Sequence, residues 1–134
     1  MSIRYYEINL NEIVSKARRI LEKHVKIAVL YGSATRRKLV RDIDIAVYME
    51  PEPTLKQLLI LEAKLEREIK IPVELRLITH LHPETAYKAL TKGVKIVVKD
   101  PLLLNALTTM MLGQIQDMKI KYKTITRQTK TYAK

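Results

Sequence analysis

Residues 30–48, which read LYGSATRRKLVRDIDIAVY, decide the fold of this chain. An apolar run ends at Gly32-Ser33, a basic excursion follows, and Asp42-Ile43-Asp44 begins a second apolar run. Residues i and i+2 of a strand project from the same face, so Asp42 and Asp44 are predicted to point together while the isoleucines face the core. Two adjacent like charges repel unless a cation lies between them. The pair therefore indicates a divalent metal, and oxygen ligands suit Mg²⁺ or Mn²⁺.

An Asp-x-Asp pair by itself is also typical of a solvated strand end. The joint pattern is more specific, because the Gly-Ser turn and the carboxylates both lie at strand ends with cations between them. Small residues let the backbone approach a triphosphate, and carboxylates hold the metal that neutralises it. The order of these parts favours a site for a phosphorylated ligand.

The bulk composition is that of one soluble globular domain. The chain has 134 residues, of which 47% are apolar and 29% charged, with a net charge of +11. No apolar run approaches the roughly 20 residues of a membrane span, and the N-terminus lacks the apolar core of a signal peptide. There is no cysteine, and hence no disulfide or thiolate metal site. We expect a cytoplasmic protein that does not bind membranes.

Periodicity and capping residues predict an α/β (α+β) fold, a small mixed β-sheet flanked by helices. Thr54 and Gln57 form a predicted capping box, and Gly93 is predicted to end a helix in the left-handed conformation. We expect a domain over residues 1–122 and a basic C-terminal tail over 123–134, either flexible or a solvated helix end. The predicted helices cover 10–23, 54–70, 83–92 and 101–122, and the predicted strands 25–31, 43–49, 73–78 and 94–98.

With Gly32 and Ser33 at the turn, Arg36 after it and the Asp42/Asp44 pair on the next strand, the chain resembles the DNA polymerase β-like nucleotidyltransferase superfamily. It is most similar to the stand-alone minimal nucleotidyltransferases of archaea and bacteria, many of them antitoxins. Glu74, on the strand after the intervening helix, is the candidate third carboxylate of that family. An alternative from the residues themselves is an exposed Glu74 paired with Arg76.

The resemblance implies transfer of a nucleoside monophosphate from an NTP, with ATP the expected donor, to a hydroxyl acceptor. Asp42, Asp44 and Glu74 would bind the metal and act in catalysis, while Gly32, Ser33 and Arg36 would bind the nucleotide. The acceptor implied for minimal members is a tyrosine of a HEPN-domain toxin. Arg37 and Lys38 either assist Arg36 or form an exposed basic hairpin.

Three departures from the family pattern, Thr35, Arg37 and Glu74, favour an alternative function. The chain would then be a catalytically degenerate module of the same fold that binds a protein or nucleic acid. The basic tail permits RNA binding, or RNA as the acceptor. The last helix carries apolar residues on more than one face, which indicates either burial on its own sheet or contact with a partner or a second copy of the chain.

Overall fold

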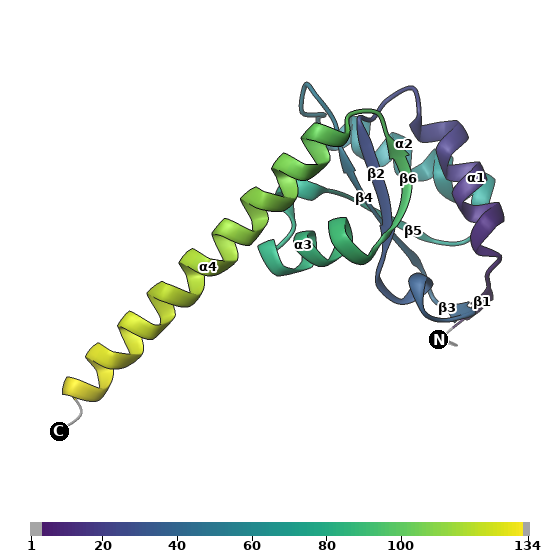
Figure 1. Cartoon of the computed structure of the whole chain (residues 1–134). Helices are drawn as coiled ribbons and strands as arrows, with labels where there is room; N and C mark the ends of the chain where they lie inside the picture. Colours follow the sequence, from purple (N-terminus) through teal and green to yellow (C-terminus); the bar gives the residue numbers. More distant parts are fainter. Residues whose placement is uncertain (1–3, 133–134) are drawn as a thin grey trace.

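The computed structural model describes the backbone of residues 4–132 and the side chains of residues 4–127. It is built on a four-stranded sheet with the order β5-β4-β2-β6, in which β2 runs antiparallel to both β4 and β6, and β4 runs parallel to β5 (Figure 1). A separate two-stranded ribbon joins β1 to β3. The strands are β1 (Tyr6–Glu7), β2 (Ile27–Tyr31), β3 (Leu39–Val40), β4 (Ile43–Tyr48), β5 (Val73–Leu77) and β6 (Val94–Val98).

Helices cover both faces of this sheet. The amphipathic helices α1 and α2 bury their apolar residues on one face, and α3 with the first half of α4 packs on the other. A predicted mixed sheet flanked by helices is therefore confirmed. The helices are α1 (Leu10–Leu21), α2 (Leu55–Ile69), α3 (Pro83–Lys92) and α4 (Pro101–Tyr132), with short 3-10 turns η1 (Gly32–Thr35) and η2 (Ile78–His80).

The start of each helix that shapes the site follows from its capping residues. Asn9 caps α1, and the Thr54–Gln57 capping box predicted for α2 is complete. At α3, the His82 imidazole accepts a hydrogen bond from the Glu84 N–H, and proline occupies the first helical position, where no N–H is needed. These caps fix where α2 leaves the sheet and where α3 returns to it.

The edge strand β5 is anchored by glutamates of α2. The Glu66 carboxylate accepts a hydrogen bond from the Val73 N–H at 3.0 Å, and that of Glu62 accepts one from the Leu75 N–H at 2.9 Å. The outer edge of β5 is therefore bound to its own covering helix. This anchoring holds the intervening Glu74 in register beside β4.

Two sequence-based expectations are corrected by the structure. Gly93 ends α3 with φ −70°, not in the left-handed conformation. A Cβ at this position would lie 2.3 Å from the Ala89 carbonyl oxygen and 2.8 Å from that of Leu30, so glycine is needed for close packing of α3 on β2. The last helix ends at Tyr132, ten residues beyond the predicted end at Tyr122.

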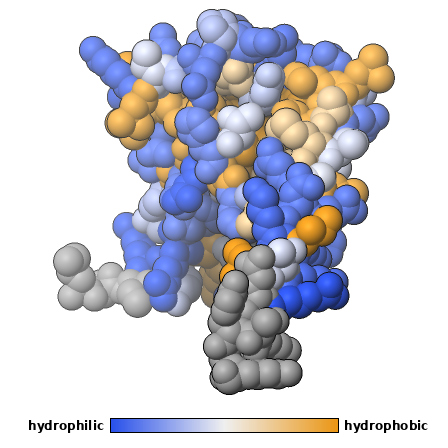
Figure 2. Space-filling view, turned by 90° about the vertical axis from the view of Figure 1, so that its left-hand side faces the viewer, coloured by the Kyte–Doolittle hydropathy of each residue, from blue (hydrophilic) through white to orange (hydrophobic). Residues whose placement is uncertain are grey.

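The long helix α4 projects away from the body of the molecule (Figure 1). At 1.5 Å per residue, its 32 residues span about 48 Å. Only its first half is anchored, because Leu107, Met111 and Ile115 are buried whereas the described side chains from Met118 to Ile125 are exposed. Apolar side chains alternate with hydrophilic ones on the side of the molecule to which α4 extends (Figure 2).

The division into a domain over residues 1–122 and a tail over 123–134 stays a prediction, and residues 1–3 and 133–134 lie outside the described part. Within the described residues, no helix is long and apolar enough to cross a membrane.

Candidate active site

The Gly-Ser turn lies at the end of β2, as predicted. Gly32 has φ +76°, a conformation that side chains rarely adopt, and the Thr35 hydroxyl donates a 2.7 Å hydrogen bond to its carbonyl. A Cβ at residue 32 would lie 2.5 Å from Oδ2 of Asp44. Glycine is thus required twice here, for the turn and for the space that Asp44 occupies.

The sheet register brings the carboxylates together. Asp44 on β4 is paired with Tyr31 on β2 and with Glu74 on β5, so the three side chains are neighbours across one face. Asp42 is exposed and lies just before β4. Its charge still acts on Asp44, and the same-face pair stays a prediction.

Burial and neighbouring carboxylates favour the neutral form of Asp44. Burial is the largest cause that raises the pKa of Asp44 to about 6, followed by the hydrogen bond to Glu74 and the charge of Asp42. The pKa of Glu74 is lowered, first by its hydrogen bond with Arg76 and then by that with Asp44. When this pair binds one proton, the two directions favour Asp44 as the carboxyl that carries it and donates to the Glu74 carboxylate.

Glu74 also forms the ion pair with Arg76 that the sequence left open. The two side chains project from the same face of β5, two residues apart, and make both a hydrogen bond and a salt bridge. The guanidinium partly offsets the negative charge of the carboxylates, since it lowers the pKa of Asp44 as well. Glu74 thus contacts Asp44, as expected for a third carboxylate, and at the same time forms an ion pair with Arg76.

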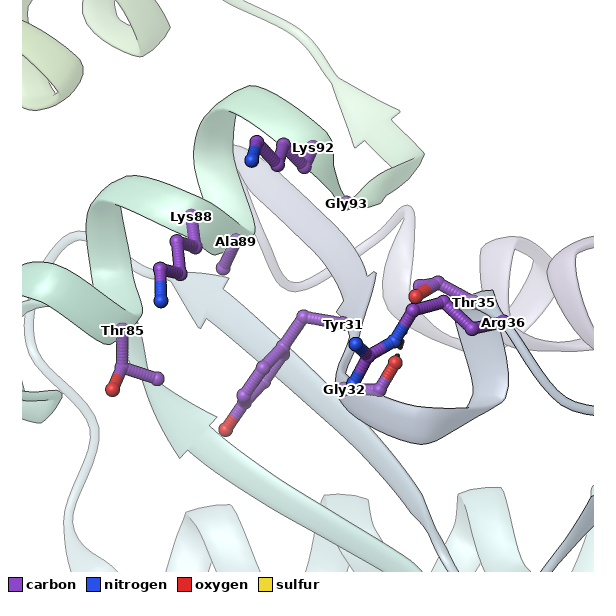
Figure 3. Close-up of a pocket in the computed structure, with 9 residues that line it drawn as sticks. All are labelled: Tyr31, Gly32, Thr35, Arg36, Thr85, Lys88, Ala89, Lys92 and Gly93. Atoms are coloured by element: carbon purple, nitrogen blue, oxygen red, sulfur yellow. Dashed lines mark hydrogen bonds between the residues drawn. The ribbon is translucent and has the colours of Figure 1, made fainter.

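A cavity of about 360 Å³ adjoins this cluster, between the end of β2 and α3 (Figure 3). Arg36 and Gly32 both line it, and their role in nucleotide binding stays a prediction. Ser33 belongs to the same turn but lies outside the lining. The lining residues are Tyr31, Gly32, Thr35, Arg36, Thr85, Lys88, Ala89, Lys92 and Gly93.

Sequence reasoning missed the contribution of α3 to this cavity. Lys88 and Lys92 are one helical turn apart and both line it. The sequence predicted no role for these lysines, and only the packing of α3 shows what their helix face borders. Arg37 and Lys38 are exposed and lie outside the lining, as expected for the exposed basic hairpin.

The donor set of the carboxylate cluster fits a hard divalent cation. Within the described residues no three His, Cys, Asp or Glu side chains form a preassembled metal centre. The fit comes instead from chemistry: carboxylate oxygens are the ligands that Mg²⁺ and Mn²⁺ prefer, and burial followed by the neighbouring carboxylates raises the pKa of Asp44. A cation at this point would relieve the repulsion.

A carboxylate cluster on a small mixed sheet lies beside a basic cavity in this domain. A family model described as polymerase beta, nucleotidyltransferase, matches residues 15–102, more than half of the chain. The chain belongs to this nucleotidyltransferase family. No curated protein matches it.

Solved structures at low identity share the fold. One is a chain of a toxin–antitoxin complex with AMP-PNP, 18% identical, with a TM-score of 0.72 over 86% of this chain and 96% of that one. A second comes from the MntA toxin–antitoxin complex in a variant with two aspartates changed to glutamate, 16% identical, TM-score 0.72, covering 90% and 98%. A third comes from a complex of a tri-AMPylated Shewanella oneidensis HEPN toxin with its MNT antitoxin, with 16% identity, TM-score 0.72 and coverage of 90% and 98%.

Proposed function

We propose that this chain is an AMP transferase that moves the AMP group of ATP to a tyrosine hydroxyl of a HEPN-type partner protein. The observation that carries the proposal is the placement of Asp44 between the Gly32 turn and Glu74, beside a basic cavity. Membership of the nucleotidyltransferase family supports the reaction class. The fold shared with chains of toxin–antitoxin complexes, one with AMP-PNP and one with an AMPylated HEPN toxin, supports the nucleotide and the acceptor.

In this reaction the acceptor oxygen forms a bond to the α-phosphorus, and the bond from that phosphorus to the bridging oxygen of pyrophosphate breaks. The hydroxyl proton passes to the carboxylate cluster, and pyrophosphate leaves with the bonding electrons. Asp42, Asp44 and Glu74 would hold Mg²⁺ or Mn²⁺, which lowers the pKa of the attacking hydroxyl and neutralises triphosphate charge. Gly32 and Ser33 position the phosphates, and Arg36 stabilises charge on the departing group.

The test is transfer of label from ATP to a HEPN-domain protein from the same organism, with Mg²⁺ present. Label in the α-phosphate should appear on the partner, and label in the γ-phosphate should not. The variant Asp42→Asn/Asp44→Asn should lose at least about a thousandfold of this activity. Glu68→Gln, an exposed carboxylate on α2, is the matched control and should retain it. Equal labelling by the double variant would contradict the proposal.

The second candidate is a degenerate module that binds the same kind of partner without catalysis. The ion pair between Glu74 and Arg76 favours it, because a carboxylate held by a guanidinium is a weaker base and a less available metal ligand. This alternative predicts a stable complex with the partner, no label from either form of ATP, and undiminished partner binding by the double variant.

A further inference from the structure

Three cationic side chains from two separate elements converge on the cavity beside β2. Arg36 follows the η1 turn, whereas Lys88 and Lys92 belong to α3, about fifty residues later in the chain. Figure 3 shows the guanidinium and the Lys88 ammonium directed into the space between the turn and α3. The sequence separation means that only folding assembles this group.

The packing of α3 determines which of its residues face the cavity. Ala86, Ala89 and Leu90 are buried and attach the helix to the sheet. The residues of α3 that line the cavity are Thr85, Lys88, Ala89 and Lys92, whose spacing of three and four residues is that of one helix face. Two lysines therefore form a stripe along the wall, with a threonine hydroxyl at its N-terminal end.

Within the described part of the chain, no acidic side chain lines this cavity; the carboxylates of the neighbouring cluster lie next to it. The nine lining residues include no aspartate or glutamate. Among the described side chains, the ion pairs use Lys16, Lys26, Arg76 and His80 as cations, and none of the cations of the cavity. A concave surface lined by three cationic side chains and by no carboxylate is suited to an anion that carries several charges.

Tyr31 borders both this basic cavity and the carboxylate cluster. Its side chain lines the cavity, and its strand partner is Asp44. Burial and the charges of Asp44 and Glu74 raise the pKa of Tyr31 to about 12, so the ring stays neutral between the two regions. A ligand with a polyanionic end and a reacting end would span both sides of the ring.

We propose that this cavity binds the β- and γ-phosphates of the nucleotide, and that Lys88 and Lys92 make the site select a nucleoside triphosphate over a monophosphate. The inference rests on the proposed function for the identity of the donor, and it adds two binding residues from α3. The volume of the cavity, about 360 Å³, lies at the small end of the range for ligand-binding sites. The polyphosphate is held on one side of Tyr31 while the α-phosphorus faces Asp44 on the other.

The test uses inorganic tripolyphosphate, ATP and AMP as probes, with binding measured calorimetrically at low and moderate salt. The wild-type chain should bind tripolyphosphate and ATP more tightly than AMP. The variant Lys88→Gln/Lys92→Gln should weaken tripolyphosphate binding by about ten- to a hundredfold, because charge-assisted contacts to phosphate are lost, and should change AMP binding less than about threefold.

Lys56→Gln/Lys64→Gln is the matched control, because it removes two exposed charges from α2 on the opposite face of the sheet. It should leave the affinity for tripolyphosphate within about twofold. Because Lys88 and Lys92 are exposed and in no ion pair with a described side chain, both double variants should unfold at the wild-type temperature. Tripolyphosphate affinity that is unchanged in the Lys88/Lys92 variant would overturn the proposal, as would equal loss in the control.

Failure of the proposed transferase function can be distinguished from failure of the cavity assignment. Asp44→Asn should keep tripolyphosphate binding while AMP transfer is lost. If the wild-type chain binds tripolyphosphate through Lys88 and Lys92 but transfers no AMP to a partner, the cavity assignment stands and the transferase proposal fails. If transfer occurs and the lysine variant has an unaltered KM for ATP, the transferase stands and the cavity assignment is overturned.

Discussion

Replacing Asp44 by asparagine should stabilise the protein above neutral pH. The folded chain favours the protonated form of Asp44, since burial, the hydrogen bond to Glu74 and the charge of Asp42 raise its pKa from 3.8 to about 6. Asparagine has the same shape as the protonated acid. Its amide N–H can donate to the Glu74 carboxylate in place of the acid proton, so the variant keeps the favourable contact without the unfavourable charge.

The sign of the pH dependence follows from the two pKa values of Asp44. Below pH 3.8 the group is protonated in both the folded and the unfolded chain, and it causes no difference. Between pH 3.8 and about 6 the unfolded chain releases the proton first, so the wild-type free energy of unfolding falls relative to the variant. Above about pH 6 the difference is complete and constant.

The magnitude can be worked from the same two values. A raised pKa of about 6 against 3.8 corresponds to about 3 kcal/mol if fully expressed. Asp44 is only half-buried, and water screens part of the effect, which leaves about 1–2 kcal/mol. For a domain of this size the asparagine variant should melt about 3–6 °C above the wild type at pH 8.

The assay is thermal and denaturant unfolding of both proteins from pH 4 to pH 8. Asp42→Asn is the control, and because that carboxylate is exposed its effect should be much smaller. Addition of Mg²⁺ or Mn²⁺ at pH 8 should stabilise the wild type and not the Asp44→Asn variant. An asparagine variant that is less stable at pH 8, or a difference that does not vary with pH, would refute the reasoning.

Three further predictions concern the glycines and the last helix. In denaturant titration, Gly93→Ala should lower the free energy of unfolding by about 2–3 kcal/mol, because the added Cβ would meet two backbone carbonyls. Gly113→Ala should raise it by up to about 1 kcal/mol, because a Cβ there would have nothing within 4 Å. Equal effects of the two substitutions would contradict the packing argument. Gly32→Ala should displace the Asp44 carboxylate and reduce AMP transfer at least about tenfold, and an unaltered rate would show that the close contact is not functional. Truncation after Met118 removes no buried side chain among those described, so it should change the free energy of unfolding by less than about 0.5 kcal/mol. If the basic tail binds RNA, electrophoretic titrations should show weaker and less salt-dependent RNA binding by the truncated protein. Identical RNA binding by the two proteins would exclude that role.

The parts of the fold that could be predicted from the sequence are those governed by local chemistry. Alternating and continuous apolar runs located the four strands of the main sheet, and the Thr54–Gln57 pair located the start of α2. The strands β1 and β3 were missed because two residues are too few to show a period. Gly93 was assigned the wrong conformation, since a sequence cannot reveal that Ala89 and Leu30 carbonyls approach it.

The candidate site shows the same division between local and tertiary information. The spacing of Asp42 and Asp44 predicts their proximity, and the structure places Asp42 just before β4, where its charge acts on Asp44. The contact between Asp44 and Glu74 depends on the parallel pairing of β4 with β5, which spacing does not show. The stripe of Lys88 and Lys92 could not be assigned, because a lysine at the surface of a helix looks the same whether it borders solvent or a cavity. Tyr31 reads as the end of an apolar strand, and its position between the two charged regions emerges only from the sheet register.

Arg76 acts on both carboxylates that meet across β4 and β5. Its hydrogen bond lowers the pKa of Glu74, so the carboxyl of the cluster that binds a proton first on acidification is Asp44, beside the turn. A divalent cation must then compete with one proton at one carboxylate, and with a pKa of about 6 that competition is weak at neutral pH and strong under acidic conditions. If Arg76 were absent, the pKa of Asp44 would rise further, because the guanidinium charge is the one cause that lowers it. The ion pair that weakens Glu74 as a base therefore also keeps the cluster available to a cation near neutral pH.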